Sequence, residues 1–91
     1  RDWMLLLGRK TAREKVATFL LDMGRRLRPD RTGMIDLPLS RQQIADILGI
    51  TIETVSRQMT DLKRQGVIDL CGRRGVRLVD GAALEALAEG A

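Results

Sequence analysis

The sequence predicts a mainly α-helical domain with a small β-hairpin. Its elements follow the order helix, strand, helix, helix, strand, strand, helix, which is that of a winged helix-turn-helix. Three observations predict this class: apolar residues recur at helical spacing behind capping signals, a glycine separates two such segments, and two short β-rich runs follow them. With 91 residues, of which 44% are hydrophobic, the chain has room for one domain with a modest core. We expect residues 9–91 to form this domain.

The first predicted helix begins at a capping box. Thr11 and Glu14 have the required spacing, because the threonine hydroxyl can accept from one backbone N–H while the carboxylate accepts from the other. A loop over residues 28–33 and a short strand over residues 34–37 follow, and Pro38 ends the strand. The apolar face of this helix comprises Val16, Phe19, Leu20, Met23 and Leu27.

Two further helices are predicted on either side of a glycine corner. Ser40 and Gln43 form the capping box of the first, and Gly49 occupies the position where helices end in the left-handed conformation. Thr51 caps the second, over residues 51–65, and so short a turn between two helices is typical of a helix-turn-helix. The expected inner faces are Ile44, Ile47 and Leu48 on the first helix and Ile52, Val55, Met59 and Leu62 on the second.

The C-terminal third predicts the wing. Residues 67–70 and 76–79 are β-rich, and the intervening residues 71–75 contain glycine, as hairpin connections of this length usually do. A final helix begins at Asp80, with Leu84 and Leu87 facing inward.

The polar side of the predicted helix 51–65 carries groups suited to reading DNA. Glu53, Ser56 and Arg57 supply an acceptor, a hydroxyl and a guanidinium on adjacent turns, and Thr60 and Arg64 continue the same side. Such groups recognise base edges in the major groove. A surface ion pair between Glu53 and Arg57, worth about 0.3–0.5 kcal/mol, is the simpler interpretation. The position after a glycine corner favours base reading, and an ion pair could also hold Arg57 in place.

Composition supports a nucleic-acid partner weakly and excludes several classes. Sixteen Lys and Arg residues against twelve Asp and Glu give a net charge of +4 and a pI near 10.2. Trp3 and Phe19 are the only aromatic residues, which argues against a single-strand binder that stacks bases on aromatic rings. The chain has no His and a single cysteine, so we expect no metal, no cofactor in this domain and no enzymatic activity.

The longest apolar run, residues 3–7, is too short to cross a bilayer, and nothing resembles a signal peptide. These features predict a cytoplasmic protein without a membrane partner.

The segment SRQQIADILGITIETVSR, residues 40–57, resembles the DNA-binding motif of the CRP/FNR family of bacterial transcription regulators. Its IETVSR stretch is closer to the FNR and FixK branch than to CRP, since that branch carries Glu, Ser and Arg at these places. The resemblance covers essentially the whole chain. It implies a homodimer that binds a palindrome with TTGAT-type half-sites and regulates transcription, with RNA polymerase as a further partner.

The resemblance also implies roles for individual residues. Arg57 would bind the guanine, Glu53 the neighbouring base pairs, and Ser56 would help select the outer thymine side. Gln58 departs from the family, which has an apolar residue or Thr there, and we expect a local packing change without loss of base reading. The family's phosphate contacts match Ser40, Arg41, Gln42, Thr51 and Thr54.

Arg73 and Arg74 lie at the predicted wing tip, where they either touch DNA backbone or minor groove or form a solvated turn; Arg77 is a further candidate. Cys71 either fills space at the base of the hairpin or is a redox-active thiol whose thiolate these arginines favour.

By the same resemblance, residues 1–8 are the end of a dimerisation helix and a hinge, with a sensor domain before them. The alternative function is a winged helix used for protein contact. An interaction face of that kind needs apolar or aromatic anchors, whereas the helix 51–65 presents polar groups.

Overall fold

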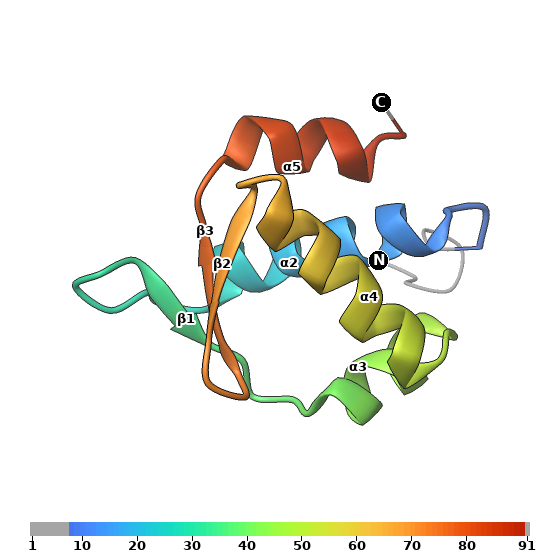
Figure 1. The fold of residues 1–91 in the computed structure, drawn as a ribbon, viewed down its shortest axis with the longest axis horizontal. Helices are drawn as coiled ribbons and strands as arrows, with labels where there is room; N and C mark the ends of the chain where they lie inside the picture. The colour runs from blue at the N-terminus through green and yellow to red at the C-terminus, as the bar shows by residue number, and fades with distance from the viewer. Residues whose placement is uncertain (1–7, 91) are drawn as a thin grey trace.

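The computed structural model describes residues 8–90, so the prediction for residues 1–7 lies outside the described part. The element order confirms a winged helix-turn-helix (Figure 1). The elements are α2 (Ala12–Arg26), β1 (Met34–Asp36), α3 (Arg41–Leu48), α4 (Ile52–Arg64), β2 (Ile68–Cys71), β3 (Gly75–Leu78) and α5 (Gly81–Ala88).

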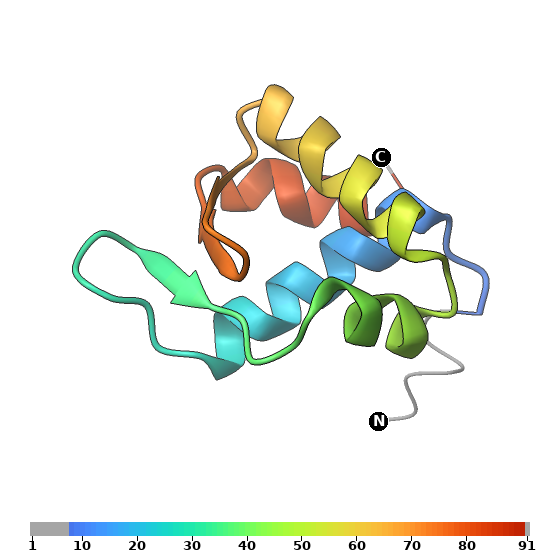
Figure 2. The same ribbon diagram turned by 60° about the horizontal axis from the view of Figure 1, so that its bottom comes forward.

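Helix α2 runs through the middle of the domain. It packs on α5 along one side and on α4 along another, and the small sheet closes one end (Figures 1 and 2). The predicted capping box is formed at its start, with Glu14 N donating to Thr11 Oγ1 over 3.2 Å and Thr11 N donating to Glu14 Oε1 over 2.6 Å. The boundary read from the sequence is therefore confirmed.

This capping box predicts an acid-sensitive contribution to stability. The hydrogen bonds from the Thr11 backbone and side chain lower the pKa of Glu14 from its ordinary value of 4.5. A lowered pKa means that the stabilisation is complete above 4.5 and is lost as the pH falls through the lower folded value. We expect the thermal midpoint of the wild-type chain to fall more steeply below that pH than the midpoint of Glu14→Gln.

Thermal unfolding of both chains between about pH 6 and pH 3 tests this. The pKa of Asp30 is also lowered, by its hydrogen bonds to Thr32 and Met34, but Asp30 titrates in both proteins and cancels in the comparison. Parallel midpoint curves for the two chains would show that the Glu14 carboxylate contributes nothing.

The core is one cluster drawn from every helix and from the sheet. Most predicted inner residues belong to it, but Ile47 was wrongly assigned, because 47% of its surface is exposed. On α3 the small Ala45 is buried in its place, and Ile47 lies about 110° around the helix from the centre of the buried face. The cluster comprises Val16, Ala17, Phe19, Leu20, Ile35, Leu37, Ile44, Ala45, Leu48, Val55, Met59, Leu62, Val67, Ile68, Val76, Leu84 and Ala88.

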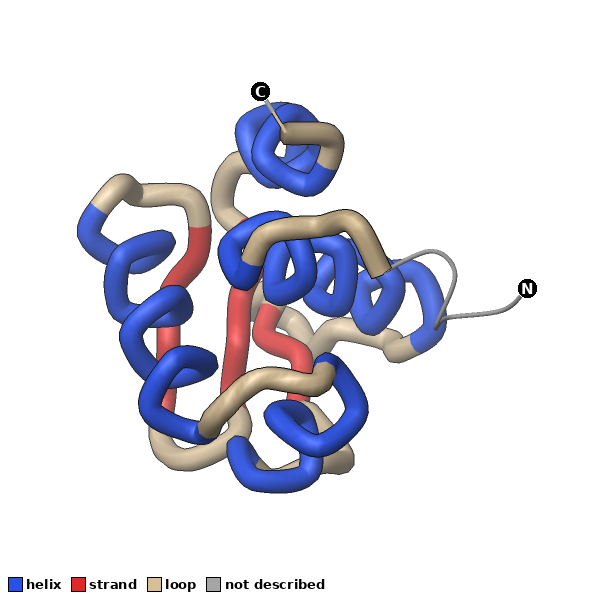
Figure 3. The backbone as a smooth tube through the Cα atoms, turned by 90° about the vertical axis from the view of Figure 1, so that its right-hand side faces the viewer, coloured by secondary structure: helices blue, strands red, loops and turns tan. Residues whose placement is uncertain are grey.

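The sheet has three strands in the order β1-β3-β2, so the first strand joins the predicted hairpin (Figure 3). Met34 pairs with Arg77 and Asp36 with Gly75, both antiparallel. The hairpin strands begin and end within a residue of the prediction, which leaves residues 72–74 as the loop. Beyond β1, the N–H of Leu37 donates to the carbonyl of Arg74 over 2.9 Å. This bond holds the wing against the segment that leads into α3.

Candidate nucleic-acid interface

The corner between α3 and α4 has the geometry of a helix-turn-helix. Gly49 ends α3 at φ 72° and ψ 32°, in the left-handed region that the sequence predicted. The N–H of Ile50 donates to the carbonyl of Ala45 over 3.1 Å, and Thr51 caps the next helix. Val55 is fully buried beneath the corner, which fixes the direction in which α4 leaves it.

Helix α4 is sharply two-sided, as predicted. Val55, Met59 and Leu62 are buried, and Ile52 is half-buried at the start of the same side. The structure adds Lys63 to the predicted polar side, since its spacing of three residues from Thr60 repeats the helical period. The exposed residues of α4 are Glu53, Ser56, Arg57, Thr60, Lys63 and Arg64.

The base-reading candidates are not paired with one another. Glu53 and Arg57 are exposed, and among residues 8–90 no ion pair within 4.0 Å joins them. The simpler interpretation of these two residues as a surface ion pair is therefore wrong for this structure. Glu53 lies in the first turn of α4, where a carboxylate is favoured by the helix dipole.

The first turn of α4 also contains two adjacent hydroxyls. Thr51 Oγ1 accepts from Thr54 N over 3.2 Å, and the two Oγ1 atoms lie 2.8 Å apart. Thr51 is exposed and Thr54 is half-buried, so both predicted phosphate contacts are at the end of α4 that follows the corner.

The start of α3 contains three predicted phosphate contacts, and the first of them, Ser40, is also the predicted cap. Ser40 Oγ accepts from Gln43 N over 3.2 Å, and Ser40 N donates to Gln43 Oε1 over 2.9 Å. Gln42 is exposed and donates through Nε2 to Asp46 Oδ1 over 2.9 Å. Arg41 differs, because it is half-buried and its Nη1 atom is buried without a hydrogen-bond partner. Burial also lowers the pKa of the Arg41 side chain.

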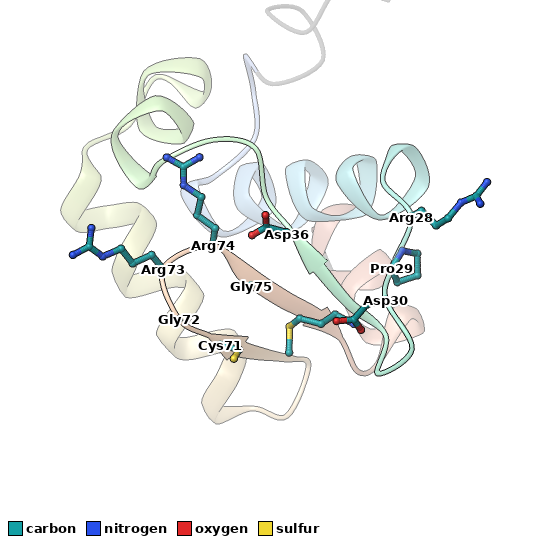
Figure 4. Close-up of a pocket in the computed structure, with 10 residues that line it drawn as sticks. Arg28, Pro29, Asp30, Asp36, Cys71, Gly72, Arg73, Arg74 and Gly75 are labelled. Carbon is teal, nitrogen blue, oxygen red and sulfur yellow. The ribbon is translucent and has the colours of Figure 1, made fainter.

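Two of the three arginines of the wing are exposed to solvent. Arg73 and Arg74 are exposed, and Figure 4 shows both projecting from the hairpin loop away from the sheet. Arg77 instead forms an ion pair with Asp69, its register partner on β2, so the further candidate is engaged within the sheet. A cavity of about 710 Å³ on the open side of the sheet has Asp36, Cys71 and both exposed arginines in its lining (Figure 4).

Cys71 is exposed, so the prediction that it fills space at the base of the hairpin was wrong. Successive side chains in a strand point to opposite faces, and Leu70 packs against the core, which sends Cys71 outward. The redox-active thiol stays a prediction.

Gln58 is half-buried at the flank of the buried side of α4. Its Oε1 atom is buried without a partner, and the residue borders a cavity of about 410 Å³ together with Thr11, Glu14 and Leu87. Within residues 8–90, no three His, Cys, Asp or Glu side chains are grouped as metal ligands would be. Over the same residues, no helix has the length and apolar character needed to span a membrane.

The chain matches known proteins over most of its length. Residues 14–87 match the family model described as a Crp-like helix-turn-helix domain. The transcriptional activator protein FnrL of Cereibacter sphaeroides is 56% identical over 90 residues, covering 92% of this chain and 36% of FnrL. The nitrogen fixation regulation protein FixK of Bradyrhizobium diazoefficiens is 52% identical over 90 residues, covering 97% of this chain and 38% of that protein.

The fold matches as well. The structure of FixK2 from Bradyrhizobium japonicum superimposes with a TM-score of 0.88 at 51% identity, covering 97% of this chain and 43% of that one. The chain thus spans little more than a third of the length of these curated relatives. Both relatives are named as regulators and not as enzymes. Together with the glycine corner and the two-sided α4, these matches show that the chain belongs to the CRP/FNR family, on its FNR- and FixK-like side, and forms the family's helix-turn-helix DNA-binding domain.

Proposed function

We propose that α4 enters the major groove of a TTGAT-type half-site, where Glu53, Ser56 and Arg57 read base edges. One observation carries this proposal: the exposed polar row begins directly after the Gly49 corner, and its charged members are not paired with each other. A guanidinium without an internal partner can form two hydrogen bonds to guanine O6 and N7, and a carboxylate can accept from a cytosine amino group.

The contacts that position the domain come from three places around α4. The helix starts at Ser40 and Thr51 present hydroxyls and free N–H groups, which suit phosphate oxygens. The wing contributes Arg73 and Arg74. These contacts fix the register of the domain on DNA without reading sequence, and they comprise Ser40, Arg41, Gln42, Thr51, Thr54, Arg73 and Arg74.

The same proposal extends to assembly and regulation. Two copies, joined through a dimer contact N-terminal to this domain, bind the two halves of a palindrome. RNA polymerase is the partner through which the bound dimer acts on transcription, in the bacterial cytoplasm. The names of the relatives, a transcriptional activator and a nitrogen fixation regulator, support a regulatory role. A protein-contact role for α4 has less support, because its exposed side is polar.

An engineered dimer tests the palindrome directly. Joining a parallel coiled coil to Arg1 supplies a dimer contact, so the second half-site is bound at a local concentration in the millimolar range. We expect the fused dimer to bind a TTGAT palindrome about 100-fold or more tightly than the 91-residue chain, and to gain nothing comparable on a single half-site. Equal gains on the palindrome and on a scrambled duplex would contradict the proposal.

A further inference from the structure

A basic cavity lies between the start of α3 and the tip of the wing. Its volume is about 400 Å³, and it is lined by Ser40, Arg41, Gly72, Arg73 and Arg74. Three arginines from two separate elements therefore line one space. Within the described residues, none of the three has a carboxylate within 4.0 Å. The cavity thus has a concentrated positive charge without an ion-paired carboxylate among the described residues.

Arg41 is the least satisfied of these side chains. Its Nη1 atom is buried and has no acceptor, and burial lowers the pKa of the side chain. A buried charged donor without a partner costs free energy. Because solvent does not reach the buried atom itself, an anion in the cavity would offset this cost through its charge and through hydrogen bonds to the rest of the guanidinium. The start of α3 also favours an anion. The capping box satisfies the N–H groups of Ser40 and Gln43, whereas the two N–H groups between them have no intrahelical acceptor.

The cavity is held open by backbone structure. The N–H of Leu37 donates to the carbonyl of Arg74, which ties the wing loop to the segment before α3. In Figure 4 the Arg74 side chain projects toward this segment, while Arg73 projects from the other side of the loop. At Gly75, a Cβ atom would lie 2.5 Å from the carbonyl oxygen of Cys71, so the tight loop that places both arginines depends on glycine.

We propose that this cavity is a preformed site for one phosphoryl group, held jointly by Arg41 and Arg74, which DNA supplies from its backbone and inorganic phosphate supplies in the DNA-free chain. Only the part of this inference in which DNA supplies the phosphate rests on the proposed function. It adds that the first helix of the motif and the wing share a single phosphate, and that free phosphate competes with DNA for this site.

The DNA-free chain tests the site first. Sodium phosphate is titrated against sodium chloride at equal ionic strength, and the thermal midpoint is followed. We expect phosphate alone to raise the midpoint by about 6–11 °C at ten times its Kd, and the rise should continue with the logarithm of the phosphate concentration. Arg41→Gln and Arg74→Gln should abolish the rise, whereas Arg31→Gln, which removes the same charge from an exposed loop, should keep it. Equal midpoints in phosphate and chloride would overturn the proposal, as would an unchanged rise in both cavity variants.

The salt dependence of binding to a duplex of unrelated sequence tests the DNA source. Neutralising one phosphate contributes about 0.9 to the slope of log K against log salt. We expect the double variant Arg41→Gln/Arg74→Gln to lose about 0.9 in total, since both side chains hold one phosphate. A loss of about 1.8 would mean two separate phosphates and overturn the shared site. If the chain gave both expected results but bound all DNA sequences equally, the shared phosphate site would be supported and base reading by α4 would be contradicted.

Discussion

Arg57→Ala is expected to weaken binding to a TTGAT-type half-site by about 1–3 kcal/mol, which is the value of one good bidentate contact with guanine. The reason is local: Arg57 is exposed on the side of α4 opposite the buried Val55 and Met59, and no carboxylate among residues 8–90 pairs with it. Binding to duplexes with other bases at the guanine position should change much less, so the variant loses preference rather than general affinity. Competition binding with all four bases at that position measures both effects at a fixed salt concentration.

Two matched variants separate base reading from charge. Arg57→Lys keeps the positive charge but not the planar fork, so we expect most of the guanine preference to be lost. Arg64→Ala removes the same charge from the far end of the same exposed side, where Arg64 lies 3.9 Å from Asp61, and should weaken all sequences alike. A guanine preference that survived Arg57→Ala would show that another residue reads this position.

Phe19→Ala is expected to lower the free energy of unfolding by about 3–5 kcal/mol, the usual cost of removing a buried aromatic ring. Phe19 is 2% exposed on α2, and it is the only aromatic residue of the described core. The loss is a large share of the stability of a domain of this size. Urea unfolding followed by circular dichroism measures it.

Ile47→Ala is the matched control for this change. The helical spacing of α3 predicts a core residue at Ile47, whereas the structure leaves 47% of its surface exposed, so we expect a loss of about 1 kcal/mol or less. A loss near that of Phe19→Ala would restore the prediction from the sequence and contradict the position of α3 in the structure.

The helix boundaries could be predicted because their signals are local. The capping boxes at Thr11 and Ser40, the left-handed Gly49 and the cap at Thr51 each depend on residues within one turn, and each is formed as expected. The polar and buried sides of α4 follow from the helical period in the same way. These features contain most of the candidate reading surface, which is why the sequence located it.

Features that depend on long-range pairing were missed or assigned wrongly. The joining of Met34–Asp36 to the hairpin pairs residues about forty positions apart, and no local pattern encodes it. The exposure of Cys71 could not be predicted because the sequence places residue 71 in the hairpin connection, whereas in the structure it is the last residue of β2, and its side of the sheet follows from the strand register. Arg41 is half-buried and shares a cavity with the wing loop, which is more than thirty residues away in the sequence, so its environment could not be read from its position in the motif.

Selection of bound sequences from a random DNA pool tests most directly whether α4 reads DNA in the way described. The selection uses the chain dimerised through a coiled coil at Arg1, and the same dimer with Arg57→Ala is selected in parallel. We predict that the wild-type dimer enriches a palindrome of TTGAT-type half-sites and that the variant loses selection at the guanine position. An identical enriched motif for both dimers, or no enriched motif for the wild type, would contradict base reading by the exposed side of α4.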